Sequence, residues 1–114
     1  MRPVSGSVVI AGGACCVGGT AGETIDIAAA FEATSPMGDV TQMRTQASYG
    51  GGCVTESALA ASPWEPFVSQ RKFPVTVGIN WIGFYVSVQY RDAAGLLSAV
   101  YCDDISVEGM PPQP

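Results

Sequence analysis

The chain has 114 residues, of which 47% are apolar, so it can form one domain with a buried core. Its net charge of −5 argues against nucleic-acid binding, because phosphate neutralisation needs clustered basic side chains. No apolar run approaches the ~20 residues that a membrane-spanning helix needs, so no membrane span is expected.

The first predicted strands lie in the N-terminal half. Residues 4–10 form a short β-rich run that ends at a glycine-rich break, and residues 18–22 are expected to be a loop. Residues 24–31 alternate between apolar and polar side chains, which indicates a second strand with one buried face. Residues 40–48 are a third strand, with Met43 inward and Arg44 outward.

The middle of the chain has weaker signals. Residues 49–62 are irregular, with at most one helical turn, and residues 64–68 read as a short edge strand because they contain Pro66. Phe73, Val75 and Val77 alternate in the next strand. Pro74 lies inside this strand, so one side of it should lack a pairing partner.

The clearest pattern is in the C-terminal third. Apolar residues from Phe84 to Tyr90 fall on alternate positions, which predicts a strand with one buried and one wet face. Residues 92–95 are typical of a tight turn, in which Asp92 bonds the backbone ahead of it. A second strand over about residues 99–107 completes a β-hairpin.

About seven short strands with regularly spaced turns predict an all-β sandwich. We expect its core to contain the inward side chains of these strands: Ile25, Ile27, Phe31, Met43, Val75, Val77, Val86, Val88 and Tyr90.

The four cysteines are Cys15, Cys16, Cys53 and Cys102. An even number in a sequence rich in Ser, Thr, Gly and Ala, as in secreted proteins, favours disulfides, whose pairing cannot be read from spacing. The alternatives are free buried thiols and a metal site. Zinc sites usually include closely spaced ligands and histidine, and this chain has no histidine.

Few residues suit catalysis. The lack of histidine excludes Ser-His-Asp and Cys-His mechanisms. Asp103 and Asp104 are neighbours on a strand, so they point to opposite faces and cannot flank one glycosidic bond. Asp92 with either of them could ligate calcium, but a turn role for Asp92 is favoured. We expect no enzyme activity, no cofactor and no metal.

Several aromatic residues raise the possibility of carbohydrate binding, because sugars stack on exposed rings. Tyr85 should point outward, and with Trp64 it is the candidate ligand contact. The alternative is that Trp64 and Trp81 cover the edge or core of the sandwich, since large aromatic residues are mostly buried.

Short motifs also occur in a characteristic order along residues 5–108. They are residues 6–14 (GSVVIAGGA), 40–44 (VTQMR), 64–67 (WEPF), 86–95 (VSVQYRDAAG) and 101–105 (YCDDI). In this order the chain resembles an immunoglobulin-like, fibronectin-type-III-like repeat of large bacterial surface and secreted proteins. The resemblance implies two antiparallel sheets and a non-catalytic spacer or interaction module.

The same resemblance implies a cysteine pairing. Cys53 would meet Cys15 or Cys16 at one pole, and the other of these two would meet Cys102. A bridge between the adjacent Cys15 and Cys16 is the less favoured alternative. Apolar Leu96 and Leu97 stand where the repeat commonly has a polar residue, and this departure exposes apolar surface at a pole.

The leading functional expectation is a structural or spacer module of an exported bacterial surface protein. Residues 1–110 would form the domain and residues 111–114 a Pro-rich linker or tail, with Met1 either native or an added start. The alternatives are a subunit of an extracellular filament or coat, joined through its tails or strand edges, and a carbohydrate-binding module. The expected partners are neighbouring domains, copies of the chain itself, or glycans.

Overall fold

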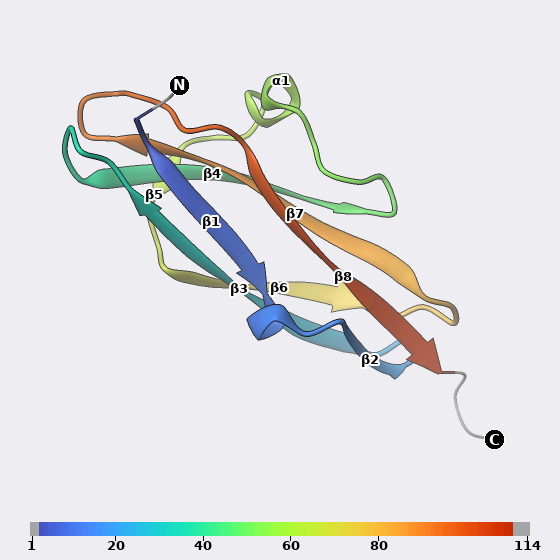
Figure 1. Ribbon diagram of the computed structural model, residues 1–114. Helices are drawn as coiled ribbons and strands as arrows, with labels where there is room; N and C mark the ends of the chain where they lie inside the picture. The colour runs from blue at the N-terminus through green and yellow to red at the C-terminus, as the bar shows by residue number, and fades with distance from the viewer. Residues whose placement is uncertain (1–2, 111–114) are drawn as a thin grey trace.

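The computed structural model describes residues 3–110, which form two β-sheets packed face to face (Figure 1). The three-stranded sheet has the order β1-β3-β6, and the five-stranded sheet has the order β2-β8-β7-β4-β5. The bounds are β1 Ser5–Ile10, β2 Cys16–Thr20, β3 Thr24–Thr34, β4 Val40–Tyr49, β5 Glu65–Pro66, β6 Gln70–Thr76, β7 Ile82–Asp92 and β8 Tyr101–Met110. The predicted all-β sandwich is confirmed. Met1 and the Pro-rich tail lie outside the described residues.

The predicted C-terminal hairpin is β7 and β8, paired antiparallel with Val86 opposite Asp103 and Ser87 opposite Cys102. At the turn, the Asp92 carboxylate accepts hydrogen bonds from the backbone N–H groups of Ala94 (3.0 Å) and Leu96 (2.9 Å). Asp92 therefore has the turn role that its position in the sequence predicts.

The core lies between the sheets. Phe84, Val86, Val88 and Tyr90 are all fully buried, as their alternation predicts. The other expected core residues are also buried, except Ile25, which is partly buried against the cluster. Strands β1 and β8 add core residues outside the expected list: Val8, Ile10, Ile105 and Val107.

Both proline-containing strands lie at sheet edges. β6 carries Pro74 and pairs only with β3, and the two-residue β5 pairs only with β4. The expected helical turn is α1 (Glu56–Leu59), which Thr55 caps by accepting a hydrogen bond from the Ala58 N–H at 3.2 Å. A 3-10 turn, η1 (Ala11–Gly13), follows β1.

The loop expected at residues 18–22 is wrong for residues 18–20, because Cys16–Thr20 form β2 and pair in parallel with β8, and only residues 21 and 22 form a turn. Every other pairing between named strands is antiparallel within residues 3–110. A Cβ atom at Gly18 would lie 2.4 Å from the Glu108 carbonyl oxygen, so a side chain there would clash with β8. The glycines that suggest a loop therefore permit this close strand pairing.

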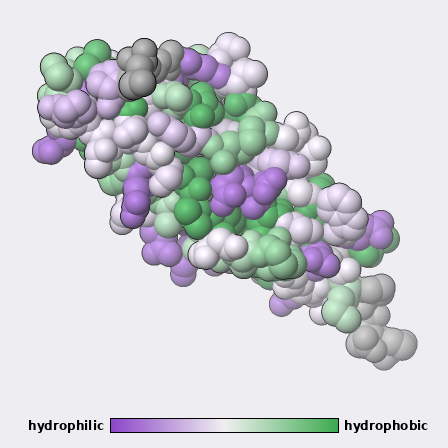
Figure 2. Space-filling view, in the orientation of Figure 1, coloured by the Kyte–Doolittle hydropathy of each residue, from purple (hydrophilic) through white to green (hydrophobic). Residues whose placement is uncertain are grey.

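The molecule is elongated, with extents of 58 × 24 × 21 Å. Val4 pairs with Ser98 near the start of the chain, whereas Met110 pairs with Thr20 at the opposite pole, where β8 ends (Figure 1). In the view of Figure 2, hydrophobic residues lie along the middle of the face, between hydrophilic ones. No helix within residues 3–110 combines the length and hydropathy required to cross a membrane.

Candidate functional site

The outer face of the five-stranded sheet, which points away from the core, has two unlike halves. Residues 53–64, here called the strap, cross the first half and carry α1, which contacts β4 and β7. Under the strap, Ser87 and Gln89 have no exposed surface and Arg44 is only 9% exposed. Arg44 points outward as expected, but the expectation that this face is wet is wrong here, because the strap covers it.

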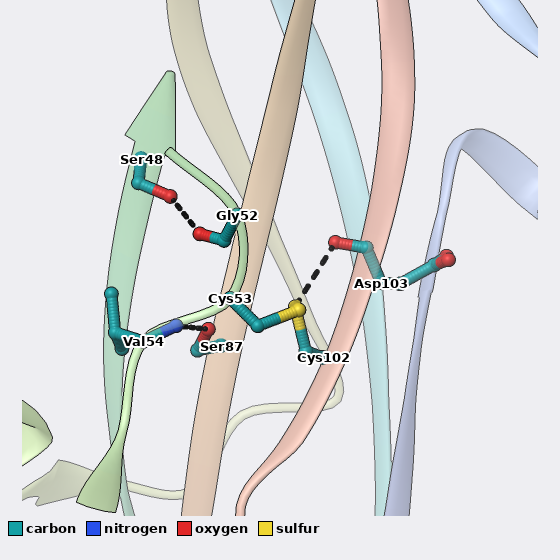
Figure 3. The surroundings of a disulfide bond; sticks show 7 residues. All are labelled: Ser48, Gly52, Cys53, Val54, Ser87, Cys102 and Asp103. Carbon is teal, nitrogen blue, oxygen red and sulfur yellow. Dashed lines mark hydrogen bonds between the residues drawn. A yellow bond between two sulfur atoms is a disulfide. The ribbon is translucent and has the colours of Figure 1, made fainter. Parts of the chain in front are cut away.

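A disulfide fixes the start of the strap (Figure 3). Cys53 bonds Cys102 of β8, with a Cα–Cα distance of 6.0 Å. Beside it, the Val54 N–H donates to the Ser87 hydroxyl at 3.0 Å, and the Ser48 hydroxyl donates to the Gly52 carbonyl at 2.7 Å. The first residues of the strap therefore contact β7 and β8, and Gly52, just before the strap, contacts β4.

An arginine–tryptophan stack fixes the end of the strap. The guanidinium carbons of Arg44 and Arg91 lie 4.4 Å and 4.2 Å from the ring centroid of Trp64. Arg44 also donates to the Gln89 side-chain oxygen, at 3.0 Å from its Nε, and Arg91 donates to Gln42 at 2.8 Å. Trp64 thus packs on the sheet as part of the strap.

The cysteine pairing implied by the resemblance is corrected by the structure, which has Cys53–Cys102 and Cys15–Cys16 bridges. The register explains the difference. Cys16 lies beside Ser106 of β8, four residues along the strand from Cys102. Four strand residues span ~13 Å, beyond the ~7 Å Cα–Cα limit of a disulfide.

The second half of the outer face is open and contains a groove of about 240 Å³. We call it the Trp81 groove; its lining residues are Cys15, Trp81, Gly83, Tyr85, Asp104, Ile105 and Ser106. Tyr85 lies opposite Asp104, and Gly83 opposite Ser106, in the β7–β8 register. Tyr85 is on the outer face as expected, but Trp81 is 72% exposed and does not cover the core.

The Tyr85 ring lies over Gly83. A Cβ atom at Gly83 would be 3.0 Å from Tyr85 Cε1 and 3.1 Å from its hydroxyl oxygen. The missing side chain at Gly83 therefore gives the ring room to lie along its own strand. Tyr85 and Trp64 belong to different halves of the face, so the structure does not bring the two candidate contacts together.

Trp81 is among the aromatic residues that raise the possibility of carbohydrate binding, but it was not selected as a ligand contact, although a signal for it was available. Trp81, Gly83 and Tyr85 are at alternate positions along β7 and the loop before it, so they share one face. Between the two aromatic residues, the only position on that face is a glycine. This pattern places two rings on one face with no side chain between them.

The acidic residues are dispersed. Asp103 and Asp104 point to opposite faces: Asp103 accepts a hydrogen bond from the Ile10 N–H at 2.8 Å, whereas Asp104 lines the Trp81 groove. Asp92 lies six residues along β7 from the partner of Asp103, ~20 Å away. Within residues 3–110, no cluster of three or more His, Cys, Asp or Glu residues could hold a metal ion.

The pKa of Asp92 lies below its ordinary value. Burial opposes ionisation of this carboxyl group, but hydrogen bonds from the Ser35 hydroxyl (2.8 Å) and from the backbone at Leu96, Ala94 and Gly95 outweigh it. The charge of Asp92 therefore stabilises the β7–β8 turn.

No protein-family model, curated protein or solved structure matches this chain. Its function is therefore inferred from its own geometry.

Proposed function

We propose that this protein is a non-catalytic structural module that separates neighbouring parts of an exported bacterial surface protein. The observation that carries the proposal is the position of its ends. The described chain starts at one pole of a body 58 Å long and ends at the other (Figure 1). A module with this geometry, placed between two domains, separates them by its own length.

The cross-links support this role. The Cys53–Cys102 bridge joins the strap to β8 across 49 residues of sequence, and all four cysteines are in disulfides. Disulfides persist in oxidising compartments, outside the bacterial cytoplasm. A cross-linked sandwich resists local opening and therefore keeps the separation of its neighbours constant.

Small-angle X-ray scattering of tandem copies tests the spacer function. One, two and three copies joined by the native residues 111–114 are compared. We expect the maximum dimension to grow by nearly the 58 Å module length for each added copy. Compact tandems whose maximum dimension grows much less would contradict the proposal.

Surface labelling tests the location. Cells that produce the protein are treated with a membrane-impermeant, amine-reactive label. Free cysteine thiols are then trapped with an alkylating reagent before lysis. We expect the chain to be labelled on intact cells. We expect none of its cysteines to react with the trapping reagent, because all of them are in disulfides. A chain that is labelled only after lysis and carries free thiols would contradict export.

One observation favours a filament subunit as a second candidate. β2 is an edge strand with neither proline nor lysine, and an open groove of about 510 Å³ runs beside it, lined by residues that include Val17 and Glu108. Unprotected edges are templates for strand addition by another chain. Electron microscopy separates the candidates, because regular polymers support the subunit role and dispersed monomers support the spacer.

A further inference from the structure

We infer that the Trp81 groove is a binding site for a single neutral pyranose ring. This inference goes beyond the spacer function and does not depend on it. The groove of about 240 Å³ is smaller than the ~300–1,000 Å³ of most ligand pockets, which suits one sugar ring. It lies on the half of the outer face that the strap leaves open.

The aromatic residues supply the stacking surface. Trp81 is 72% exposed, and the hydroxyl end of the Tyr85 ring lies over Gly83. The axial C–H bonds of a pyranose form an apolar face that packs on such rings, because these slightly positive hydrogens meet the negative face of the π system. Trp81 in the loop before β7 and Tyr85 on β7, with Gly83 between them on the same face, form an open platform of this kind.

The polar groups supply the partners for sugar hydroxyls. The Asp104 carboxylate lies opposite Tyr85, and the Ser106 hydroxyl lies opposite Gly83. Neither of these side chains, nor the Tyr85 hydroxyl, hydrogen-bonds to another residue within 3–110. A carboxylate accepts from two vicinal hydroxyls, and a serine hydroxyl both donates and accepts.

The charge of the groove selects among saccharides. Of the four basic side chains within residues 3–110, Arg44 and Arg91 stack on Trp64, Arg71 pairs with Glu65 at 3.1 Å, and Lys72 lies on β6. None of them lines the groove, whereas Asp104 does. Acidic sugars and phosphates would therefore be repelled, and a neutral ring is the expected ligand.

A quaternary ammonium ion is the chemical rival, because aromatic rings and a carboxylate also bind cations. Such cages enclose the ion with rings from several directions. Here both rings come from one strand and its preceding loop, and the groove is open to solvent. The geometry is that of a platform, which favours the flat face of a sugar.

The two tryptophans make a direct nuclear magnetic resonance experiment possible. Trp81 reports on the groove, and Trp64, which packs on the sheet at the end of the strap, reports on the fold. The oxidised protein is titrated with methyl glycosides of glucose, galactose, mannose and N-acetylglucosamine. We expect at least one to shift the Trp81 indole signal saturably, with a Kd of about 1 mM, and to leave the Trp64 signal in place.

Variants assign the contacts. Tyr85→Ala should raise Kd by about tenfold or more, Tyr85→Phe by no more than about threefold, and Asp104→Asn by an intermediate factor. Ile79→Ala is the matched control, since Ile79 is 66% exposed in the same loop as Trp81 but does not line the groove. Its Kd should equal that of the parent protein.

Three results would overturn the inference. One is a Trp81 signal that none of the four glycosides shifts. Another is binding that Tyr85→Ala and Asp104→Asn both leave intact. The third is choline binding more tightly than any of the sugars, which would assign the groove to cations. An unchanged Trp64 signal in each variant shows that the fold is retained.

Discussion

The hydroxyl group of Tyr90 connects the two sheets. The ring is fully buried in the core, with its centroid 5.9 Å from that of Phe67 and 6.2 Å from that of Tyr101. Its hydroxyl, on β7, donates to the Ser7 carbonyl of β1 at 2.6 Å. Burial, reinforced by the nearby Tyr101, raises the pKa of Tyr90. The group therefore stays a neutral donor over the range in which proteins are normally studied.

We expect Tyr90→Phe to lower the free energy of unfolding by about 1–2 kcal/mol, because the Ser7 carbonyl loses its partner inside the sandwich. Urea denaturation measures this change. Tyr101→Phe is the control, since no described residue bonds its hydroxyl, and it should cost less than about 0.5 kcal/mol. Equal losses in the two variants would show that the Tyr90 hydrogen bond contributes nothing.

Asp92 makes the stability of the fold depend on pH in the acidic range. Its folded pKa lies below the unfolded value, so its stabilising effect is complete above the unfolded pKa, ~3.9, and is lost as pH falls through the folded pKa. We expect Asp92→Asn to be less stable than the parent protein at pH 7 and to approach it near pH 2. Urea midpoints across this range measure the convergence. A difference between the two proteins that is the same at pH 7 and near pH 2 would contradict this prediction.

At the scale of elements, the strap is the feature that the alternating pattern of β7 did not predict. The pattern gave the inward residues correctly, but it assigned Ser87 and Gln89 to water. An irregular segment has no periodicity, so the sequence does not show where it lies. The observed register connects the two features: Cys102 lies opposite Ser87 and points outward, so its disulfide partner Cys53 lies over the outer face.

The strap should detach when Trp64 is removed. We expect Trp64→Ala to cost about 2–3 kcal/mol, below the ~3–5 kcal/mol of a fully buried Trp, because this ring is only partly buried. Hydrogen exchange should increase in residues 54–64 and under them, at Gln89. Trp81→Ala, the matched control, should leave both stability and exchange unchanged. A fold equally insensitive to both substitutions would show that the Arg–Trp stack does not hold the strap.

The parallel pairing of β2 with β8 could not be predicted from the sequence either. Glycine is depleted in strands, so residues 18 and 19 indicate a loop by composition alone. The strand forms because β8 supplies its hydrogen-bonding partners, each of them 90 residues later in the chain. Local sequence patterns identified the strands that bury apolar residues. A strand such as β2, which lacks this pattern, forms only because a distant segment pairs with it.

For the whole molecule, the two disulfides should differ greatly in effect. Cys53–Cys102 closes a loop with a sequence separation of 49, for which the chain-entropy treatment gives about 4 kcal/mol. We expect the Cys53→Ala/Cys102→Ala double variant to lose about 2–5 kcal/mol of unfolding free energy. Cys15→Ala/Cys16→Ala should lose less than about 1 kcal/mol, because a bridge between adjacent residues closes no long loop. Denaturant unfolding of both variants gives the comparison, and equal losses would contradict it.

The strap, the groove beside it and the cross-linked module all depend on how the cysteines pair. The pairing can be measured directly by mass spectrometry. Free thiols are trapped in acid, and the protein is then digested with trypsin without reduction. We expect peptide 45–71 to be linked to peptide 92–114, and peptide 1–44 to carry an internal bridge between Cys15 and Cys16. A disulfide joining peptide 1–44 to either of the others, or free thiols at Cys53 and Cys102, would contradict it.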